Sequence, residues 1–478
     1  MNDNKSVDEL VISYLFPPSR DVSGMVLAKR FIVDNKHFDV IQANVRDDLD
    51  LEFKRAVDDY INEQIVVDIS CNSNNLGCIF RFIKKSMAEL DKRKVYDRIY
   101  SRVWKLPNNF LAFEYKLKHP EVYWTAEFSD PMLYDTLNRK RFSEKKLISN
   151  EEYLSKINKA ILNLNDKENT DFKLLESREN VYFLVEYLAY LFADEIVFTN
   201  VNQRKVMLDQ FPVDVKDFVE KKSAIKEHPI LPKEYYNLKD FKEDLDSSKI
   251  NLGYFGNIYS KRHFESVFQA FEKLNHKHKD SLQFYFYIND KNLFEKLTSD
   301  LEISENIHIK DQVDYLDFLN LINKFDVLII NDLITSDCFE VNPYRPSKLS
   351  DYLGSDSKIW AICERGSILD SEDVEYKSFV DDYKSSIDAL ADILNDHSLG
   401  DENYGVIDDD EYLLKRITEL NVVIAECNRD YKRINSSLDR LKKKYEKLEA
   451  ENKELKEKND EILSSNSWKL TGFLRRKG

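Results

Sequence analysis

The segment 342–354, NPYRPSKLSDYLG, combines residue types that bind anions with a spacing that favours a helix start. Pro346 suits the beginning of a helix, because that position needs no amide donor. Ser347 and Lys348 then fall in the first turn, where unpaired backbone amides attract negative charge. Asp351 follows one turn later and is either a ligand for a ribose diol or an exposed acid near the positive end of the helix dipole. We therefore predict a binding site for a negatively charged ligand in this segment.

A second candidate for anion binding begins at Gly256, which ends an apolar run typical of a strand. Glycine at this point lets a ligand approach the backbone closely. Lys261 and Arg262 follow near an expected helix start, and a guanidinium forms two hydrogen bonds to a phosphate. Arg262, Lys348 and a helix N-terminus would together clamp a diphosphate. Taken alone, Lys261 and Arg262 fit a solvated turn equally well.

The stretch 125–132, TAEFSDPM, contains polar residues directly after the expected strand Val122–Ala126. The carboxyl ends of strands in an α/β sheet face the ligand cleft, so Asp130 is a candidate acid or base there, with Ser129 beside it. The alternative is an Asp-Pro turn that only shapes the loop.

These candidates need strands and helices to position them, and the chain alternates short apolar runs with amphipathic segments. This alternation predicts βαβ units and parallel sheets that are covered on both faces. In the first part we expect strands at Val11–Phe16, Asp39–Ala43, Ile65–Ile69, Val122–Ala126 and Glu195–Thr199. In the second part we expect strands at INLGYFG, SLQFYFYI, NIHIKD, DVLIIN and SKIWAICE, starting from Lys249.

The chain is long enough for several domains, and its composition changes along its length. A charged stretch at 135–175 reads as an inserted helical region on a solvated surface. Two doubly wound α/β domains with a linker between them predict a ligand cleft at the carboxyl ends of their strands. We expect a first Rossmann-like domain over 1–216, a linker over 217–248, a second Rossmann-like domain over 249–400 and a connecting segment over 401–416.

The region 417–463 has an uninterrupted seven-residue apolar repeat, which is typical of a coiled coil. We expect a homo-oligomer, most simply a parallel dimer, in which buried asparagines pair across the axis. Tyr431 and Tyr445 are bulky residues at a positions, so a trimeric coiled coil is the alternative to a dimer. The residues expected to carry the contact are Ile424, Asn452 and Asn459 at a and Leu441, Leu448 and Leu455 at d.

The C-terminal tail, 464–478, contains the apolar and basic segment Trp468–Lys477. It fits a contact with an anionic membrane surface about as well as a frayed terminus. No apolar run approaches the ~20 residues that span a bilayer, and the N-terminus lacks a signal-peptide pattern. We therefore expect a cytoplasmic protein, with the tail as a candidate for peripheral attachment to the inner face of the membrane.

The overall charge and the cysteines limit the partners. A formal net charge of −16 argues against nucleic acid as the main partner. The five cysteines are scattered and odd in number, so we expect reduced thiols and no metal site.

Several motifs, taken in order, resemble those of the GT-B glycosyltransferases, in particular the retaining enzymes of glycosyltransferase family four. YLFPPSRDVSG is similar to the first strand and glycine-bearing loop of that family, and WTAEFSDPM to an internal motif. ADEIVFTNVNQRKVML and LGYFGNIYSKRHFESVFQAF resemble the elements that end the first domain and begin the second. The opening segment matches P-x-K-L-x-E/D-Y-L-x-x-G except at its final glycine.

The resemblance implies a role for each candidate residue. Asp130 would be catalytic, with Gly24 and Ser129 in the acceptor cleft. Pro343 stands where the family has the first acid of its E-x7-E pair, and Glu340 is the nearest acid upstream. Many relatives also have a histidine where this chain has Ser129 and Asp130. The donor site would comprise Gly256, Arg262, Glu340, Asn342, Ser347, Lys348, Leu349 and Asp351.

The resemblance also implies a function. The chain would transfer a sugar from a nucleotide-diphosphate donor with retention, without a metal or other cofactor. Its acceptor would be a surface polysaccharide, a teichoic-type polymer, a lipid-linked glycan or a protein. The alternative is a catalytically degenerate GT-B protein that acts as a scaffold through its coiled coil.

Overall fold

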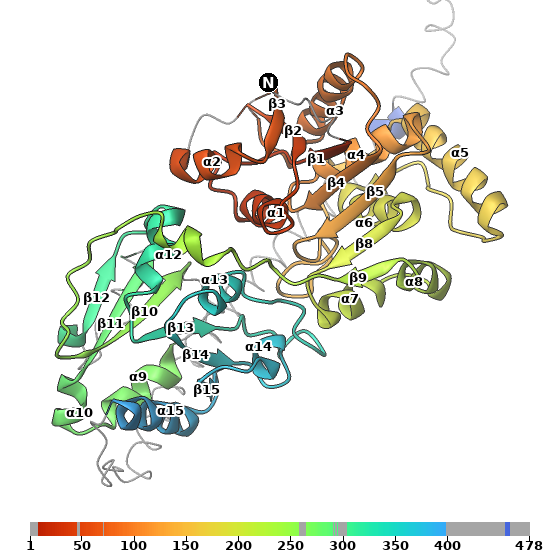
Figure 1. Ribbon diagram of the computed structural model, residues 1–478. Helices are drawn as coiled ribbons and strands as arrows, with labels where there is room; N and C mark the ends of the chain where they lie inside the picture. Colours follow the sequence, from red (N-terminus) through yellow and green to blue (C-terminus); the bar gives the residue numbers. More distant parts are fainter. Residues whose placement is uncertain are drawn as a thin grey trace, which may run out of the picture. The chain divides into compact units, whose positions relative to one another are not determined.

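Two parallel β-sheets, each covered by helices on both faces, form the computed structural model (Figure 1). Both belong to a compact unit that ends at Gly405. The predictions at Arg262, at the tail and at all of the coiled-coil positions except Leu455 lie outside the described residues. The structure describes residues 8–44, 48–69, 71–257, 264–289, 291, 294, 304–397 and 455–458.

The first sheet has seven strands in the order β3-β2-β1-β4-β5-β8-β9, and every neighbouring pair is parallel. The order reverses between β1 and β4, and this reversal is where open α/β sheets bind ligands. The strands are β1 Glu9–Ile12, β2 Phe38–Ala43, β3 Ile61–Val67, β4 Arg98–Val103, β5 Tyr123–Phe128, β8 Glu195–Phe198 and β9 Ser223–Ile225. The helices are α1 Val22–Val33, α2 Leu51–Asp58, α3 Leu76–Leu90, α4 Pro107–Lys118, α5 Glu151–Glu168, α6 Val181–Phe192, α7 Val201–Leu208 and α8 Val213–Glu220.

The second sheet repeats this topology with six parallel strands in the order β12-β11-β10-β13-β14-β15. Its reversal point lies between β10 and β13. The strands are β10 Ile250–Gly256, β11 Leu282–Ile288, β12 Ile307–Lys310, β13 Val327–Asn331, β14 Lys358–Cys363 and β15 Tyr376–Phe379. The helices are α9 Glu265–Glu272, α10 His276–Asp280, α12 Tyr315–Ile322, α13 Leu349–Leu353, α14 Ile368–Ser371 and α15 Tyr383–Asp396.

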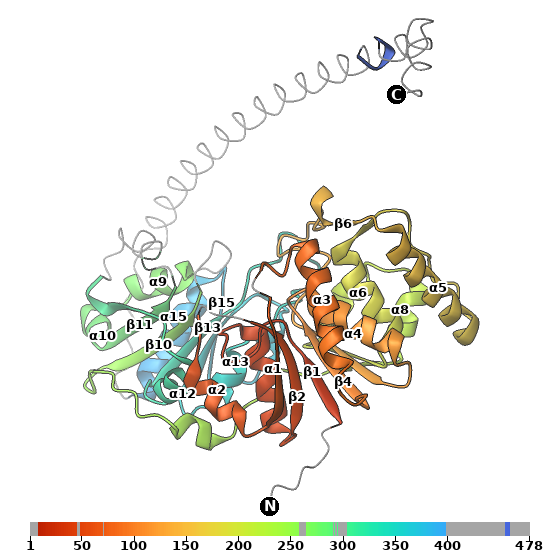
Figure 2. The same cartoon turned by 90° about the horizontal axis from the view of Figure 1, so that it is seen from above.

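Successive side chains along a strand point to opposite faces of the sheet and therefore pack into different apolar cores. Leu10 and Ile12 pack on the face of the first sheet covered by α3, α4 and α6, while Val11 packs on the face of α1 and α2 (Figure 2). This second core continues into the other domain, where it includes Leu349 of α13 and Tyr352. The two Rossmann-like domains therefore share one apolar core beside the strand ends.

The smaller elements complete the first domain. The expected helical insertion at 135–175 contains α5, the short 3-10 helix Glu144–Lys146 and the strand β6 Leu147–Ile148, which pairs with β7 Glu179–Asn180. The expected linker at 217–248 contains β9, which extends the first sheet, and the 3-10 helix Lys233–Asn237. A third 3-10 helix, Ser304–Asn306, lies in the second domain directly before β12.

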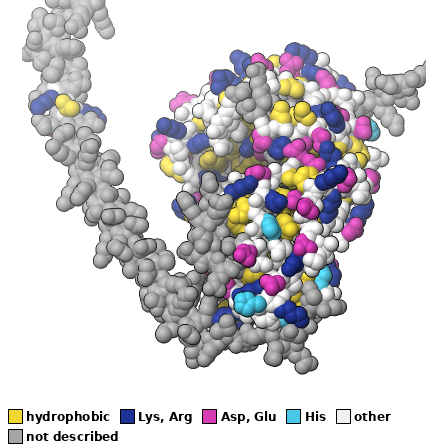
Figure 3. All heavy atoms as spheres, turned by 90° about the vertical axis from the view of Figure 1, so that its left-hand side faces the viewer, with side chains coloured by type: hydrophobic (Ala, Val, Ile, Leu, Met, Phe, Trp, Pro, Cys, Tyr) yellow, Lys and Arg dark blue, Asp and Glu magenta, His cyan; other side chains and the backbone are white. Residues whose placement is uncertain are grey.

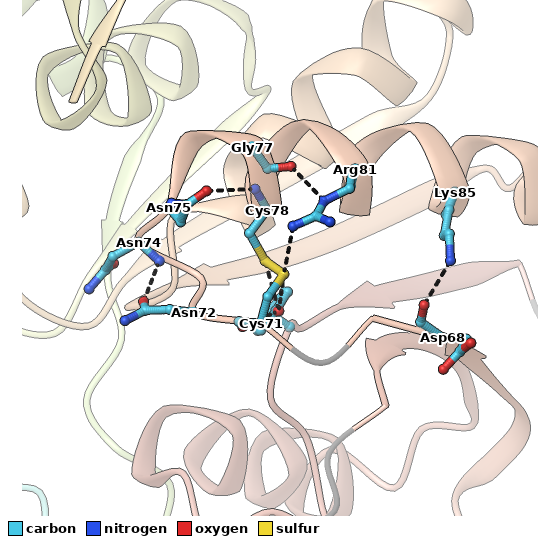
Figure 4. The surroundings of a disulfide bond; sticks show 10 residues. Asp68, Cys71, Asn72, Asn74, Asn75, Gly77, Cys78, Arg81 and Lys85 are labelled. Carbon is cyan, nitrogen blue, oxygen red and sulfur yellow. Dashed lines mark hydrogen bonds between the residues drawn. A yellow bond between two sulfur atoms is a disulfide. The ribbon is translucent and has the colours of Figure 1, made fainter. Parts of the chain in front are cut away.

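Cys71 and Cys78 form a disulfide bond between the loop after β3 and the first turn of α3 (Figure 4). The expectation of reduced thiols is therefore wrong for this pair. A spacing of seven residues gave no sign of it, because the pairing depends on how the loop folds back onto the helix. Cys338 and Cys363 are free thiols.

Basic and acidic residues are interspersed along the sequence, and their side chains are also interspersed on the surface. On the face shown in Figure 3, basic and acidic side chains are mixed, and neither sign gathers into a broad patch. Within the part of the chain that the structure describes, every helix is too short or too polar to cross a membrane.

Candidate functional site

Two neighbouring cavities lie at the carboxyl ends of the two sheets and have Arg20, Pro346 and Ser347 in common in their walls. The first, of about 450 Å³, is bounded mainly by the end of β10, the start of α12 and the start of α13. The second, of about 670 Å³, is bounded by the loops after β1, β4 and β5 and by residues 344–347. We call them the β10 cavity and the β5 cavity.

The β10 cavity contains four of the predicted donor residues: Gly256, Ser347, Lys348 and Asp351. A Cβ atom on Gly256 would lie 2.6 Å from the Tyr254 hydroxyl, so glycine is needed for the close packing there. The Lys348 ammonium lies 4.5 Å from the centre of the Phe318 ring, a distance that favours a cation–π contact. The local motif thus brings its polar residues to one cavity.

Asp351 is buried and bonded rather than exposed on its helix. Its Oδ1 accepts hydrogen bonds from Lys29 Nζ and from the Tyr315 hydroxyl, both at 2.6 Å. Lys29 belongs to α1 of the first domain and also donates to Ser350 Oγ at 3.2 Å. All three of Lys29, Tyr315 and Asp351 line the β10 cavity. The first domain therefore contributes a cation to this cavity that the sequence did not indicate.

Three predicted donor residues lie elsewhere. Glu340 is on the surface, where it pairs with Lys205 at 2.7 Å and has a side chain 80% exposed. Leu349 is fully buried in the core shared by the two domains. Asn342 is buried and donates to the Leu333 carbonyl and to Glu364. None of the three is in the wall of either cavity, because their contacts with Lys205, with the shared core and with Glu364 hold these side chains elsewhere.

Gly24 also has a structural role rather than a place in a cavity wall. A Cβ atom there would lie 2.3 Å from the Leu15 carbonyl oxygen, so only glycine lets α1 begin so close to the loop after β1. Its neighbours Ser23 and Met25 line the β5 and β10 cavities respectively. The glycine therefore positions the cavity residues beside it.

Asp130 and Ser129 line the β5 cavity, as the sequence predicted for a cleft. The Ser129 hydroxyl donates to Asp130 Oδ2 at 3.1 Å. Burial raises the pKa of Asp130, and the positive charge of Arg102 opposes this only partly. Raised carboxyl pKa values in a cavity are typical of groups that handle protons.

The loop after Asp130 is held by a buried acid on α6. Glu186 is 1% exposed, and its Oε1 accepts from the amides of Met132 and Leu133 at 2.6 and 2.8 Å. Burial raises the pKa of Glu186 from 4.5 to about 7, and the two amides lower it only in part. This acid therefore positions the loop that carries Asp130.

A buried network of charged side chains adjoins the β5 cavity, and its member Arg102 lines that cavity. Glu127 in β5 is fully buried and accepts from Arg30, Arg102 and the Tyr100 hydroxyl. Burial raises the pKa of Glu127, but the charges of Arg30 and Arg102 outweigh it and hold the pKa well below its usual range. Arg102 also donates to Ser23 Oγ at 2.6 Å and to His228 Nε2 at 3.2 Å.

Sequence reasoning missed the residues that only the fold brings to the cavities. Arg102 lies in β4, whose charged and polar residues hid the strand. His228 lines the β5 cavity and lies outside any recognisable motif, while Arg345 lines it from within the segment 342–354. The prolines and the helix start predicted this segment as a candidate site, but nothing in that pattern singled out Arg345.

No protein-family model matches the sequence, and no curated protein matches it either. Among solved structures, sucrose-phosphate synthase from Thermosynechococcus elongatus superposes with a TM-score of 0.52 at 11% identity, over 87% of this chain and 99% of that one. The catalytic domain of starch synthase IV from Arabidopsis thaliana, bound to ADP and acarbose, gives 0.53 at 10% identity over 83% and 93%. Anabaena HepE in complex with UDP-glucose gives 0.50 at 10% identity over 82% and 90%. These likenesses confirm the predicted GT-B fold, while the narrower resemblance to glycosyltransferase family four stays a prediction.

Proposed function

We propose that this chain is a glycosyltransferase that uses a nucleotide-diphosphate sugar. The observation that carries the proposal is the pair of adjoining cavities at the reversal points of the two sheets. One is lined by Lys348 and Asp351, and the other by Asp130. The GT-B structures named above include complexes with UDP-glucose and with ADP, which supports the same reading.

The β10 cavity is the proposed donor site. The diphosphate would lie against Gly256 and the start of α13, where the Lys348 ammonium balances part of its charge. Arg262, outside the described residues, is proposed as the second cation. Asp351 would bind the ribose through Oδ2, since its contacts with Lys29 and Tyr315 use Oδ1.

The β5 cavity is the proposed place of transfer. The oxygen of the acceptor hydroxyl would form a bond to the anomeric carbon while the bond to the diphosphate oxygen breaks, and the hydroxyl proton would pass to the departing diphosphate. Donors aimed at the departing diphosphate lower the barrier because they favour the charge that develops there. Asp130 would act on the sugar or acceptor hydroxyls from the wall of the cavity. We propose a retaining, metal-independent transfer.

The proposed acceptor is a surface polysaccharide, a teichoic-type polymer, a lipid-linked glycan or a protein. The segment 417–463 would join copies of the chain, and Trp468–Lys477 would bring them to a membrane surface. Two weak membrane contacts in one dimer would bind with more avidity than one.

A thermal-shift panel of UDP-, ADP- and GDP-sugars tests the proposal. A donor at about 100 times its dissociation constant would add about 2.7 kcal/mol to the free energy of unfolding. The stabilising sugar should then be consumed when candidate acceptors are added, and proton NMR of the product would give the anomeric configuration. Repeating the assay with EDTA tests metal independence. If no nucleotide sugar shifts the melting temperature, the donor assignment is wrong.

A further inference from the structure

Arg345 has a buried donor for which the described residues offer no acceptor. Its side chain is 1% exposed. Nε and Nη2 donate to Glu372 at 3.1 and 2.7 Å, and Nη2 also donates to Glu227 at 3.0 Å. Nη1 has no hydrogen-bond partner among the described residues. Arg345 lines the β5 cavity, so this donor belongs to a side chain of its wall.

His228 has a second such donor in the same wall. Arginine has no acceptor atom, so the contact of 3.2 Å between Arg102 Nη2 and His228 Nε2 requires the ring nitrogen to accept. The proton of the neutral ring then lies on Nδ1. Burial and the charge of Arg102 lower the pKa of His228 well below its usual range, which keeps the ring neutral. Nδ1 is buried and has no acceptor among the described residues.

Buried polar groups in proteins almost always have partners, so two unpaired donors in one cavity need an explanation. Both atoms only donate, as do the guanidinium groups of Arg20 and Arg141 in the same wall, which also includes the carboxylates of Asp21, Asp48 and Asp130. The two unpaired donors themselves need acceptors, and a ligand group whose oxygens only accept can serve both of them at once. Phosphate and carboxylate are the biological groups of this kind.

We propose that the β5 cavity binds a phosphate or carboxylate group, and that oxygens of this group accept from Arg345 Nη1 and His228 Nδ1. Because the cavity adjoins the donor site, the group belongs to the acceptor: the chain glycosylates an anionic acceptor. This assignment to the acceptor rests on the proposed function, whereas the anion site itself does not.

Small probes of similar carbon skeleton, two with an acid group and one without, test the anion site. Glycerol 3-phosphate, glycerate and glycerol are titrated into UDP-saturated protein, and binding is followed by calorimetry and by the fluorescence of Trp104, which lines the same cavity. We expect glycerol 3-phosphate or glycerate to bind at least tenfold more tightly than glycerol. The tighter of the two identifies the acid group. Equal or undetectable binding of all three would overturn the proposal.

Two variants assign the contact to the named atoms. Arg345→Gln and His228→Leu should each weaken binding of the charged probe about tenfold, with UDP affinity unchanged. The matched control is Arg139→Gln, since that side chain is 70% exposed and pairs only locally with Asp135. Circular dichroism checks folding, and His228→Leu keeps the test valid if Arg345→Gln unfolds. Full binding of the charged probe to a folded Arg345→Gln or His228→Leu protein would contradict the contact.

A competition experiment between glycerol 3-phosphate and UDP distinguishes this site from the donor site. If glycerol 3-phosphate displaces UDP, the anion site belongs to the donor diphosphate and the proposal is wrong. If UDP does not bind at all, the proposed function fails. The anion site then stands or falls on the charged probes alone.

Discussion

Lys29 and Asp351 form a buried ion pair of 2.6 Å that joins α1 of the first domain to α13 of the second. Their side chains are 3% and 7% exposed. The pair lies in the wall of the proposed donor cavity, so it couples the contact between the domains to the site. Asp351 is thereby held in the wall of this cavity by Lys29 of the first domain and Tyr315 of the second.

Lys29→Met should lower the free energy of unfolding by about 3–5 kcal/mol, because it leaves a buried charge without its partner. The double variant Lys29→Met with Asp351→Leu should lose less than either single variant. Urea unfolding measures all three. Lys36→Met is the control, since Lys36 pairs with Asp34 at the surface and should matter by less than about 1 kcal/mol. A double variant as unstable as the sum of the singles would argue against coupling.

Lys348→Ala should weaken binding of the preferred nucleotide diphosphate by about tenfold or more, since a charge-assisted contact contributes roughly 1.5–3 kcal/mol. The same is predicted for Arg262→Ala. Calorimetry measures both. Glu340→Gln is the informative control: its sequence position suggested a donor ligand, but its surface position predicts unchanged affinity. Wild-type affinity in Lys348→Ala would remove this lysine from the donor site.

Asp130→Asn should reduce turnover by about a hundredfold or more while donor affinity stays near wild type, because its role would be realised in the transition state. Steady-state rates and calorimetry with the donor separate the two effects. Asp171→Asn, at an exposed position, serves as the control. Normal turnover in Asp130→Asn would leave this residue as part of an Asp-Pro turn only.

Glu186 predicts a pH dependence of stability. Its pKa is raised from 4.5 to about 7 in the folded chain, so the folded state binds more protons than the unfolded state between these values. The contribution of Glu186 to stability therefore falls as the pH rises from 4.5 to 7, by on the order of 3 kcal/mol, and is constant above that.

Glu186→Gln keeps an acceptor for the amides of Met132 and Leu133 but cannot ionise. The variant should therefore be more stable than the wild type at pH 8, and the difference should shrink toward pH 5. Melting temperatures across this range measure it, with the exposed Glu176→Gln as the control. A constant difference between pH 5 and pH 8 would show that Glu186 does not titrate there.

The coiled-coil prediction concerns residues that lie almost entirely outside the described ones. Leu455 is the exception; it is helical, and 65% of it is exposed in a single chain. Full-length protein should scatter light as a dimer, whereas a chain truncated after Asp410 should be monomeric. A monomeric full-length chain at micromolar concentration would refute the prediction.

The sequence alone determined much of the fold, because strands buried on both faces are continuous apolar runs. Ile250–Gly256 and Val327–Asn331 could be recognised in this way. The strand Arg98–Val103 could not. Its polar residues are buried only because distant partners satisfy them: Ser101 bonds to Trp124, and Arg102 bonds to Glu127. Local apolar periodicity carries no information about such partners.

The same distinction applies to the site. Ser347, Lys348 and Asp351 could be found because a helix start is a local feature of the sequence. Lys29 became part of the same cavity only through a partner 322 residues away, and His228 through Arg102, 126 residues away. Glu340 failed for the opposite reason, since nearness in sequence did not direct its side chain to the cavity. Short-range spacing thus located the candidate site, while the packing of the two domains decided which charged side chains surround it.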